Sequence, residues 1–541
     1  MRPPAGAGCA QSAPLKRGAR RAACALAIVV AAVAAYAPAL RAGYVWDDDK
    51  HVTENPTLRG FGGLRAIWSD GFATPQYYPL VHTSYWIEHR LWGLAPFGYH
   101  VDNVLLHLAG AWLFYRVLAW LTLPGAGIAA ALFALHPVHV ESVAWITERK
   151  NVLSGVFYFG AALAYLRAPE GAAPSMVPVD RRRYYGSLAL FVCALLSKSV
   201  TVTLPVTLAL VVLARRGRPS RDELAPLVPM LVMGLVLASV TAWLEKHHVG
   251  AAGEDWGLTL LDRGVIASRA LVFYPTKLVW PHPLMFVYPR WDVAFGHGFN
   301  AAWPLAVGAA FVGLFALRSR IGVAPLTIAA IYAVTLSPAL GFVDFYPMRF
   351  SFVADHFQYH ASAAPLAALG WLGPRLAARA PSAARRAAPV ALVVVLAALG
   401  LTTWTRAHAY RDEASLWRDT LSKNPAAWLA HLNLGRLYGQ AGDLAAAGEH
   451  LTAAVRLEPD EGRVHINLGA LLLLEGRVDE AIEELRQGTR LEPRLADGHV
   501  NLGLAYERRG DREQAIRSYR RALEVEATSS TARARLRDLS Q

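Results

Sequence analysis

The sequence predicts an all-α protein, a polytopic transmembrane helical bundle of about eleven spans followed by a tetratricopeptide-repeat solenoid. Two observations carry this prediction. The 541-residue chain is 54% hydrophobic with a mean hydropathy of +0.27, and its apolar residues are gathered into long runs. The C-terminal part instead repeats one sequence pattern every 34 residues. We therefore divide the chain into a membrane domain, 1–407, and a repeat domain, 408–541.

The first apolar run, 22–40, follows a basic stretch that ends at Arg21. Ala37-Pro38-Ala39 resembles a signal-peptide cleavage site, so a cleaved signal is one interpretation. We favour an uncleaved anchor because the run is long enough to span a bilayer. Both interpretations place the next segment, 42–100, on the outer side of the membrane as a first outer loop.

Ten further apolar runs are predicted to span, near 102–122, 126–145, 152–167, 184–197, 200–214, 223–243, 301–317, 322–340, 361–374 and 387–403. Basic connections mark the cytoplasmic side and place the loops 42–100, 141–151 and 244–266 outside. The segment 269–289 contains Lys277 and four prolines, and two interpretations are open. If it spans the membrane, the basic clusters at 318–320 and 375–386 fall outside; if it lies along the outer interface, both fall inside, and we favour this second interpretation. This topology puts the N-terminus in the cytoplasm and the repeats in the periplasm, for a multi-pass protein of the inner membrane.

The net charge of +13 does not indicate a nucleic-acid partner, because most of the surplus arginine lies in short connections between apolar runs. The three cysteines are Cys9, Cys24 and Cys193. None falls in the repeat domain, so a disulfide framework is excluded there.

The repeats are visible as HLNLG at 431–435, HINLG at 465–469 and HVNLG at 499–503, and prolines and alanines keep the same period. This pattern predicts three full tetratricopeptide repeats near 428–461, 462–495 and 496–529. A half-repeat at 408–424 precedes them, and a capping helix follows.

An asparagine recurs on the first helix of each repeat, beside a recurring histidine. Two interpretations stay open. These side chains fill the packing between helices, or the carboxamides hold the backbone of an extended acceptor peptide in the solenoid groove. The candidate acceptor-binding residues are Asn433, Asn467 and Asn501.

Three polar clusters converge on the predicted outer side: YVWDDD at 44–49, LHPVHVESVAWITERKNVLS at 135–154 and RFSFVADHFQYH at 349–360. Charges at membrane depth are costly, so three such clusters indicate a functional pocket. HPVHVE could also ligate zinc, but Pro137 breaks its helical register and no HExxH or paired-cysteine spacing supports that reading. A metal site is therefore not favoured.

Together with ALLSKSVTVTLP at 194–205, these clusters resemble the transmembrane, tetratricopeptide-repeat-containing O-mannosyltransferases and their bacterial relatives. That family belongs to the C-type, polyprenyl-phosphate-dependent glycosyltransferases. The resemblance runs from the first span through the repeats, and it implies the same eleven-span topology and mannose as the sugar. Asp47 and Asp48 fall on the family's paired acidic motif, and Asp49 extends it.

The resemblance implies that Asp47 is the catalytic base and that Asp48 orients it or the sugar. His356 stands where the bacterial pattern commonly has arginine, so Arg349 is a second candidate for that role. The expected donor-binding residues are Asp49, His136, His139, Glu141, Arg149, Lys150, Lys198, Arg349, Asp355 and His356.

The expected function is inverting transfer of a hexose from a polyprenyl-phosphate donor to Ser/Thr hydroxyls of exported proteins, with the repeats binding the acceptor. No tightly bound cofactor is expected, and the partners are membrane lipids, the donor and acceptor polypeptides. A non-catalytic envelope scaffold and a lipid-linked sugar transporter are the alternatives. Eleven spans exceed what an anchor requires, and the charges collect on one face instead of marking a route across.

Overall fold

The computed structural model describes residues 12–166, 181–244, 257–344 and 346–540, and within them every regular element is a helix. Cys9 and part of the predicted loop 244–266 lie outside the described residues. The chain divides into two compact units. We call 1–284 with 290–413 the membrane unit, and 285–289 with 414–541 the repeat unit.

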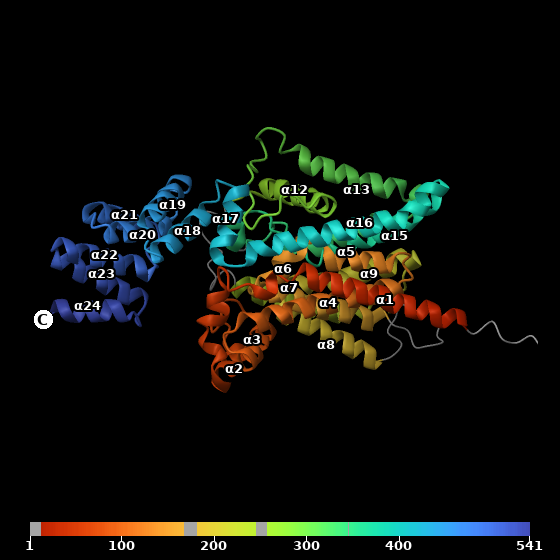
Figure 1. Ribbon diagram of the computed structural model, residues 1–541, viewed down its shortest axis with the longest axis horizontal. Helices are drawn as coiled ribbons and strands as arrows, with labels where there is room; N and C mark the ends of the chain where they lie inside the picture. Colours follow the sequence, from red (N-terminus) through yellow and green to blue (C-terminus); the bar gives the residue numbers. More distant parts are fainter. Residues whose placement is uncertain (1–11, 167–180, 245–256, 345, 541) are drawn as a thin grey trace, which may run out of the picture. The chain divides into compact units, whose positions relative to one another are not determined.

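The membrane unit contains sixteen described α-helices (Figure 1). They are α1 (Ser12–Ala35), α2 (Gly60–Ser69), α3 (Pro79–Trp92), α4 (Pro96–Trp120), α5 (Ala126–Leu135), α6 (Val140–Ala144), α7 (Arg149–Leu166), α8 (Arg181–Ser197), α9 (Leu204–Arg216), α10 (Arg221–Leu224), α11 (Leu227–Leu244), α12 (Leu260–Val279), α13 (Ala302–Ile321), α14 (Ala324–Leu336), α15 (Ala363–Arg379) and α16 (Ser382–Ala407).

By length and composition, four described segments could cross a membrane: Ser199–Arg216, Arg221–Leu244, Ala302–Ile321 and Ser382–Tyr410. The bent pair α5 and α6 makes a fifth. Eleven spans stay a prediction. The segment predicted to lie at the interface, 269–289, is helical only up to Val279, as the last half of α12.

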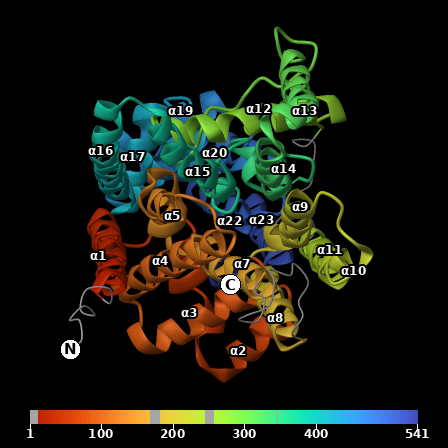
Figure 2. The same cartoon turned by 90° about the vertical axis from the view of Figure 1, so that its right-hand side faces the viewer.

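Helix packing in the membrane unit places the outer-loop motifs next to one another. α4 packs against α7, α7 against α8, and α5 against both α4 and α15 (Figure 1). Viewed along this bundle, α1 and α16 lie on one side of it and α9 and α11 on the other (Figure 2). α13 and α16 expose rows of apolar side chains, including Val312 and Val393, as expected of surfaces that face lipid.

The segment from α5 to α6 is a broken helix. Pro137 cannot donate a backbone hydrogen bond, and the chain bends by 52° between α5 and the following helical turns. The last three carbonyls of α5 therefore lose their normal helical partners, which is costly in an apolar environment. Side chains replace those partners: His139 Nδ1 at the carbonyl of Phe133 (2.8 Å), His107 Nε2 at that of Ala134 (3.3 Å) and Thr403 Oγ1 at that of Leu135 (2.8 Å).

The repeat unit is an array of antiparallel helix pairs that coincide with the predicted repeats (Figure 1). A preceding helix corresponds to the predicted half-repeat, and a final helix to the predicted cap. The helices are α17 (Glu413–Lys423), the pairs α18 (Trp428–Gln440) with α19 (Leu444–Leu457), α20 (Gly462–Leu474) with α21 (Val478–Leu491) and α22 (Ala496–Arg509) with α23 (Arg512–Val525), and α24 (Ser530–Ser540).

Glycine in the HxNLG motif permits close contact within each pair. A Cβ on Gly435 would lie 2.6 Å from Cγ of Leu451, whereas a Cβ on Gly439, one turn later in α18, would lie 3.9 Å from its nearest neighbour. We expect Gly435→Ala to destabilise the first repeat by about 1–3 kcal/mol through overpacking. Gly439→Ala should be neutral or stabilising, because alanine favours helix by up to about 1 kcal/mol. Hydrogen–deuterium exchange of α18 and α19 in the purified chain measures both, and equal protection in the two variants would contradict the packing argument.

Candidate functional site

The acidic motif forms a tight turn at the start of the segment 42–100, the predicted first outer loop. Trp46 adopts a left-handed backbone conformation (φ +49°), which is uncommon for a bulky residue and marks a constrained site. The Val45 amide donates to Asp48 Oδ2 (2.9 Å), and the Asp48 amide donates back to the Val45 carbonyl (3.1 Å). This turn fixes the direction of the two carboxylates that follow Trp46.

Asp48 joins the segment 42–100 to the segment 141–151, the first two of the predicted outer loops. Its Oδ1 accepts hydrogen bonds from the Thr147 amide (2.8 Å) and the Thr147 hydroxyl (2.7 Å). The side chain is fully buried, and burial together with the neighbouring Asp47 raises the pKa of Asp48 to about 7. Because both of its carboxylate oxygens accept hydrogen bonds, Asp48 connects the two loops.

The two carboxylate oxygens of Asp47 have different surroundings. Oδ1 is buried and has no hydrogen-bond partner among the described residues, while Oδ2 lies 3.9 Å from Nδ1 of His51. Burial raises the pKa of Asp47 to about 6, although the nearby Lys150 charge opposes the shift. A carboxylate with a free oxygen and a pKa close to neutrality is suited to general-base chemistry.

A buried ionic cluster lies at the start of α7. The carboxylate of Glu148 contacts Nζ of Lys150 (2.9 Å) and Nζ of Lys198 (3.3 Å), with Nε2 of His356 at 3.8 Å. Burial alone would raise the pKa of Glu148, but His356 and the two lysines hold it well below its usual range. Asn151 binds both Glu148 Oε2 (2.6 Å) and Lys198 Nζ (2.7 Å). The motifs at 135–154, 194–205 and 349–360 therefore meet in one network.

The motif at 349–360 is fixed to the motif at 135–154 by His356. Its Nδ1 lies 2.8 Å from Oε1 of Glu141, and its backbone carbonyl accepts from Nδ2 of Asn151 (3.1 Å). His356 occupies the short 3-10 helix Asp355–Gln358. Glu141 and His356 are therefore in direct contact, although 215 positions separate them in the sequence.

A cavity of about 240 Å³ opens beside this network. Its polar side includes Lys150, Lys198 and His356, and Lys150 also donates to Oε1 of Gln76 (3.1 Å). The rest of the wall is largely apolar and is supplied by α11 and by the segments around the 3-10 helices Ser199–Thr203 and Ser337–Ala339. The apolar lining residues are Val200, Val202, Ala238, Ala242, Pro338, Ala339, Val343, Pro347 and Phe357.

Arg149 lies outside the lining of this cavity. It is buried against the first outer loop, where it pairs with Glu88 and donates to Oδ1 of Asn103 and to the Tyr99 carbonyl (2.8 Å). Its charge is thus balanced by a carboxylate from α3, and the cation that reaches the cavity is its neighbour Lys150.

The remaining predicted donor-binding residues also lie outside the cavity lining. His139 caps the broken helix, and Nε2 of His136 lies 3.0 Å from the carbonyl of Leu278. Asp49 is half-buried and accepts from the Lys50 amide (2.7 Å). Arg349 is half-buried at the end of the 3-10 helix Tyr346–Arg349, and Asp355 is buried at the start of the 3-10 helix Asp355–Gln358.

Sequence reasoning missed several residues that build the site. They are contributed by loops or helices outside the quoted motifs, except Thr147, which lies within the second motif but carries no charge. The residues are Gln76, Tyr78, Glu88, Asn103, His107, Thr147, Asp344 and Thr403.

In the repeat unit, the recurring polar residues make local contacts. Nε2 of each recurring histidine lies 2.8–3.2 Å from the carbonyl of the recurring proline six residues earlier. Asn433 and Asn467 donate to the carbonyls four residues earlier in their own helices (2.8 Å each). The histidine contacts support the packing interpretation for the histidines. The asparagine contacts use only the amide nitrogens of Asn433 and Asn467, and both side chains are half-buried.

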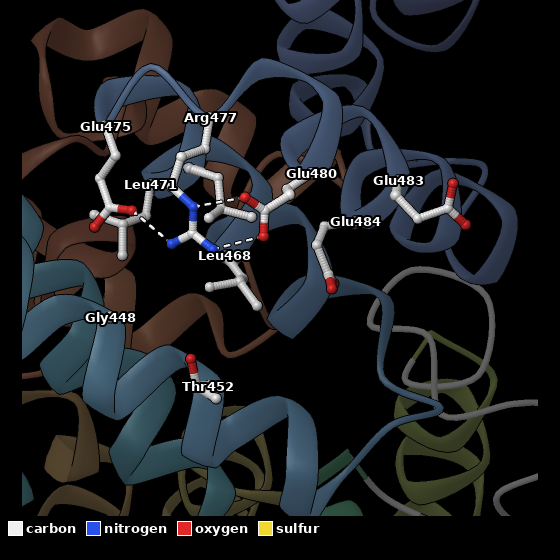
Figure 3. A pocket seen from close by; sticks show the side chains of 10 residues that line it. Gly448, Thr452, Leu468, Leu471, Glu475, Arg477, Glu480, Glu483 and Glu484 are labelled. Atoms are coloured by element: carbon white, nitrogen blue, oxygen red, sulfur yellow. Dashed lines mark hydrogen bonds and ion pairs between the residues drawn. The ribbon is translucent and has the colours of Figure 1, made fainter.

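A pocket of about 270 Å³ lies between α19, α20 and α21, and the three asparagines are outside its lining (Figure 3). Its floor includes Leu468 and Leu471, and its rim is acidic. Arg477 pairs there with Glu475 (3.1 Å) and Glu480 (2.6 Å), as the dashed lines in Figure 3 indicate.

Tetratricopeptide-repeat family models match residues 407–457, 432–495 and 496–528. Among solved structures, MamA is 23% identical with a TM-score of 0.22, over 23% of this chain and 69% of that one.

Curated relatives match the membrane unit as well. Protein O-mannosyl-transferase F38B6.6 of Caenorhabditis elegans is 24% identical over 464 residues, covering 80% of this chain and 62% of the relative. Protein O-mannosyl-transferase Tmtc1 of Drosophila melanogaster is 32% identical over 204 residues, or 35% of this chain and 22% of the relative. The chain thus spans less than two thirds of the length of these relatives. The chain is thus a homologue of proteins named protein O-mannosyl-transferases, and it carries tetratricopeptide repeats of its own.

Proposed function

We propose that this chain is an integral-membrane glycosyltransferase that moves mannose from a polyprenyl-phosphate donor to Ser/Thr hydroxyls of exported polypeptides. The similarity to proteins named protein O-mannosyl-transferases supports protein O-mannosyl transfer. The observation that carries the proposal is the unpartnered Asp47 oxygen, in the same unit as a cavity that combines lysines with an apolar wall.

In the proposed reaction, Asp47 Oδ1 accepts the proton of the acceptor hydroxyl as its oxygen attacks the anomeric carbon. The bond between that carbon and the phosphate oxygen breaks, and its electron pair stays on the phosphate. A single displacement of this kind inverts the anomeric centre. A carboxylate is needed because a Ser/Thr hydroxyl is a weak nucleophile until its proton is removed.

The lysines provide the charge that the leaving group requires. Two lysines set against Glu148 leave one positive charge at the cavity, which matches the single negative charge of a sugar phosphodiester. As the bond breaks, further charge develops on the phosphate, and preorganised cations stabilise it. The apolar wall suits the prenyl chain, so the donor can remain in the bilayer while its phosphate reaches Lys150 and Lys198.

The other site residues act by positioning in this proposal. Asp48 holds Asp47 in place through Thr147, and Glu141 orients His356. The repeat unit would bind the acceptor polypeptide outside the cytoplasm, in line with the periplasmic topology expected from the charge pattern.

The pH dependence of sugar transfer follows from the protonation state of Asp47. The base must be ionised, so kcat/KM should fall about tenfold for each pH unit below about 6, the value to which burial raises the Asp47 pKa. Lys150 lowers that pKa, so Lys150→Met should move the acidic limb of the profile toward higher pH. A pH–rate profile of sugar transfer measures both, and an acidic limb centred near pH 4 would contradict the assignment of the base.

The direct test uses the purified chain, radiolabelled mannosyl phosphoprenol and a Ser/Thr-containing peptide. We expect label in the peptide, with inverted anomeric configuration. A scaffold or a transporter would give no labelled peptide, and transfer from a nucleotide sugar instead would remove the lipid donor from the proposal.

A further inference from the structure

Asp344 is the one acidic side chain in the described lining of the membrane-unit cavity. Its Oδ1 lies 2.7 Å from Nη2 of Arg263, a buried residue of α12. Nη1 of the same guanidinium donates to the carbonyl of Gly341 (2.6 Å). Arg263 therefore clamps the short loop 341–344 at both ends and fixes the carboxylate at the cavity wall.

The ion pair with Arg263 leaves the Asp344 carboxylate able to accept further hydrogen bonds. A carboxylate has about four lone-pair sites, and the guanidinium uses those of one oxygen. The side chain is 32% exposed, while that of Arg263 is 10% exposed. A carboxylate held at a cavity surface can accept hydrogen bonds from a ligand without a large loss of conformational entropy.

The chemistry of the donor determines what this carboxylate can bind. A phosphate is repelled by a second anion, and a prenyl chain has no hydrogen-bond donor. Sugar hydroxyls are the donor molecule's only hydrogen-bond-donating groups, and carboxylates are strong acceptors for them. We propose that Asp344 binds hydroxyls of the transferred sugar and sets which hexose the cavity accepts. This inference rests on the proposed function.

A divalent cation that bridges Asp344 and the donor phosphate is the alternative ligand of this carboxylate. A cation of this kind takes about six oxygen ligands or more, several of them carboxylates in dedicated sites. The described cavity lining supplies one carboxylate beside two lysines, and no group of three or more candidate ligands occurs in the described part of the chain. A hydroxyl partner fits this arrangement better.

The test compares two ligands on the full chain in lipid nanodiscs: mannosyl phosphoprenol, and the same polyprenyl phosphate without sugar. Asp344→Asn should weaken binding of the first by about tenfold, the loss expected for a hydrogen bond to a charged acceptor. Binding of the sugar-free lipid should not change. If Asp344→Asn weakens the binding of both ligands equally, or of neither, the assignment to sugar hydroxyls is overturned. Repeating the comparison with added Mg²⁺ or EDTA identifies a bridging cation. Both ligands carry the phosphate, so a metal bridge would make the binding of both depend on Mg²⁺.

A second measurement examines selectivity. The donors are phosphoprenols that carry mannose or its epimers at C2, C3 and C4. The differences in kcat/KM between these donors should be smaller for Asp344→Asn than for the wild-type chain. Arg263→Gln is the matched variant, because it breaks the same ion pair and keeps the carboxylate. It should lower thermal stability while retaining the order of epimer preference. An unchanged spread in Asp344→Asn, or a loss of preference in both variants, would show that only the fold of the loop matters.

The two proposals can fail separately. If the wild-type chain transfers no sugar at all, the proposed function is wrong, and the ligand-binding comparison still decides the role of Asp344. If transfer occurs but Asp344→Asn raises only the KM of the acceptor peptide, this carboxylate serves the acceptor and the specificity proposal is overturned.

Discussion

Asp47→Asn should reduce sugar transfer by about 10²–10⁴-fold, the usual contribution of a positioned general base. Asparagine has nearly the same shape but cannot take the proton of the acceptor hydroxyl. Donor binding should change little, because Asp47 lies outside the cavity lining. Single-turnover transfer from labelled mannosyl phosphoprenol measures the chemical step, and a parallel binding measurement separates it from donor affinity.

Asp70→Asn is the matched control for that variant. Asp70 belongs to the same outer loop, is exposed at the end of α2, and uses its Oδ1 to accept from the Phe72 amide, which asparagine can also do. The control should retain wild-type transfer. Undiminished transfer by Asp47→Asn would remove this residue as the base, and equal losses in both variants would indicate a general disturbance of the loop.

Arg149→Ala should destabilise the membrane unit severely, by roughly 3–5 kcal/mol, because it leaves a buried partner without its counter-charge. Burial already raises the pKa of Glu88 to about 7 in the presence of Arg149. The substitution also removes the hydrogen bonds to Asn103 and to the Tyr99 carbonyl. The expected result is a large fall in melting temperature and in the yield of folded protein after detergent extraction.

The double variant Arg149→Met with Glu88→Gln tests the cause. Removing both charges should recover much of the stability, since a buried ion pair can often be replaced by neutral groups at little cost. The recovered protein should transfer sugar, because Lys150 and Lys198 still line the cavity. A stable double variant without transfer would restore Arg149 as a donor-phosphate residue.

The repeat unit was the most predictable part of the molecule. Each repeat is a local helix pair, so its period in sequence is also its period in space, and the helix pairs fall within the predicted boundaries. The membrane unit was harder because hydropathy indicates apolar runs but not bends. The broken helix at Pro137 is completed by His107 and Thr403, which lie far from it in sequence.

The motifs predicted which loops meet, but not which side chain faces the cavity. Arg149 and Lys150 are successive residues on one helix, so they point about 100° apart. Glu88 draws Arg149 toward the first outer loop, and that carboxylate lies 61 residues earlier in a segment with no motif. Asp344 escaped prediction for the same reason, since its significance depends on Arg263, 81 residues away.

The capping of the broken helix also bears on biosynthesis. The carbonyl of Leu135 is satisfied by a hydroxyl from α16, 268 residues further along the chain. During synthesis this carbonyl therefore stays without its final partner until nearly the whole membrane unit has been inserted. The bend between α5 and α6 then acquires its final hydrogen bonds late, and a nascent or truncated chain that lacks α16 leaves the carbonyl of Leu135 without this partner.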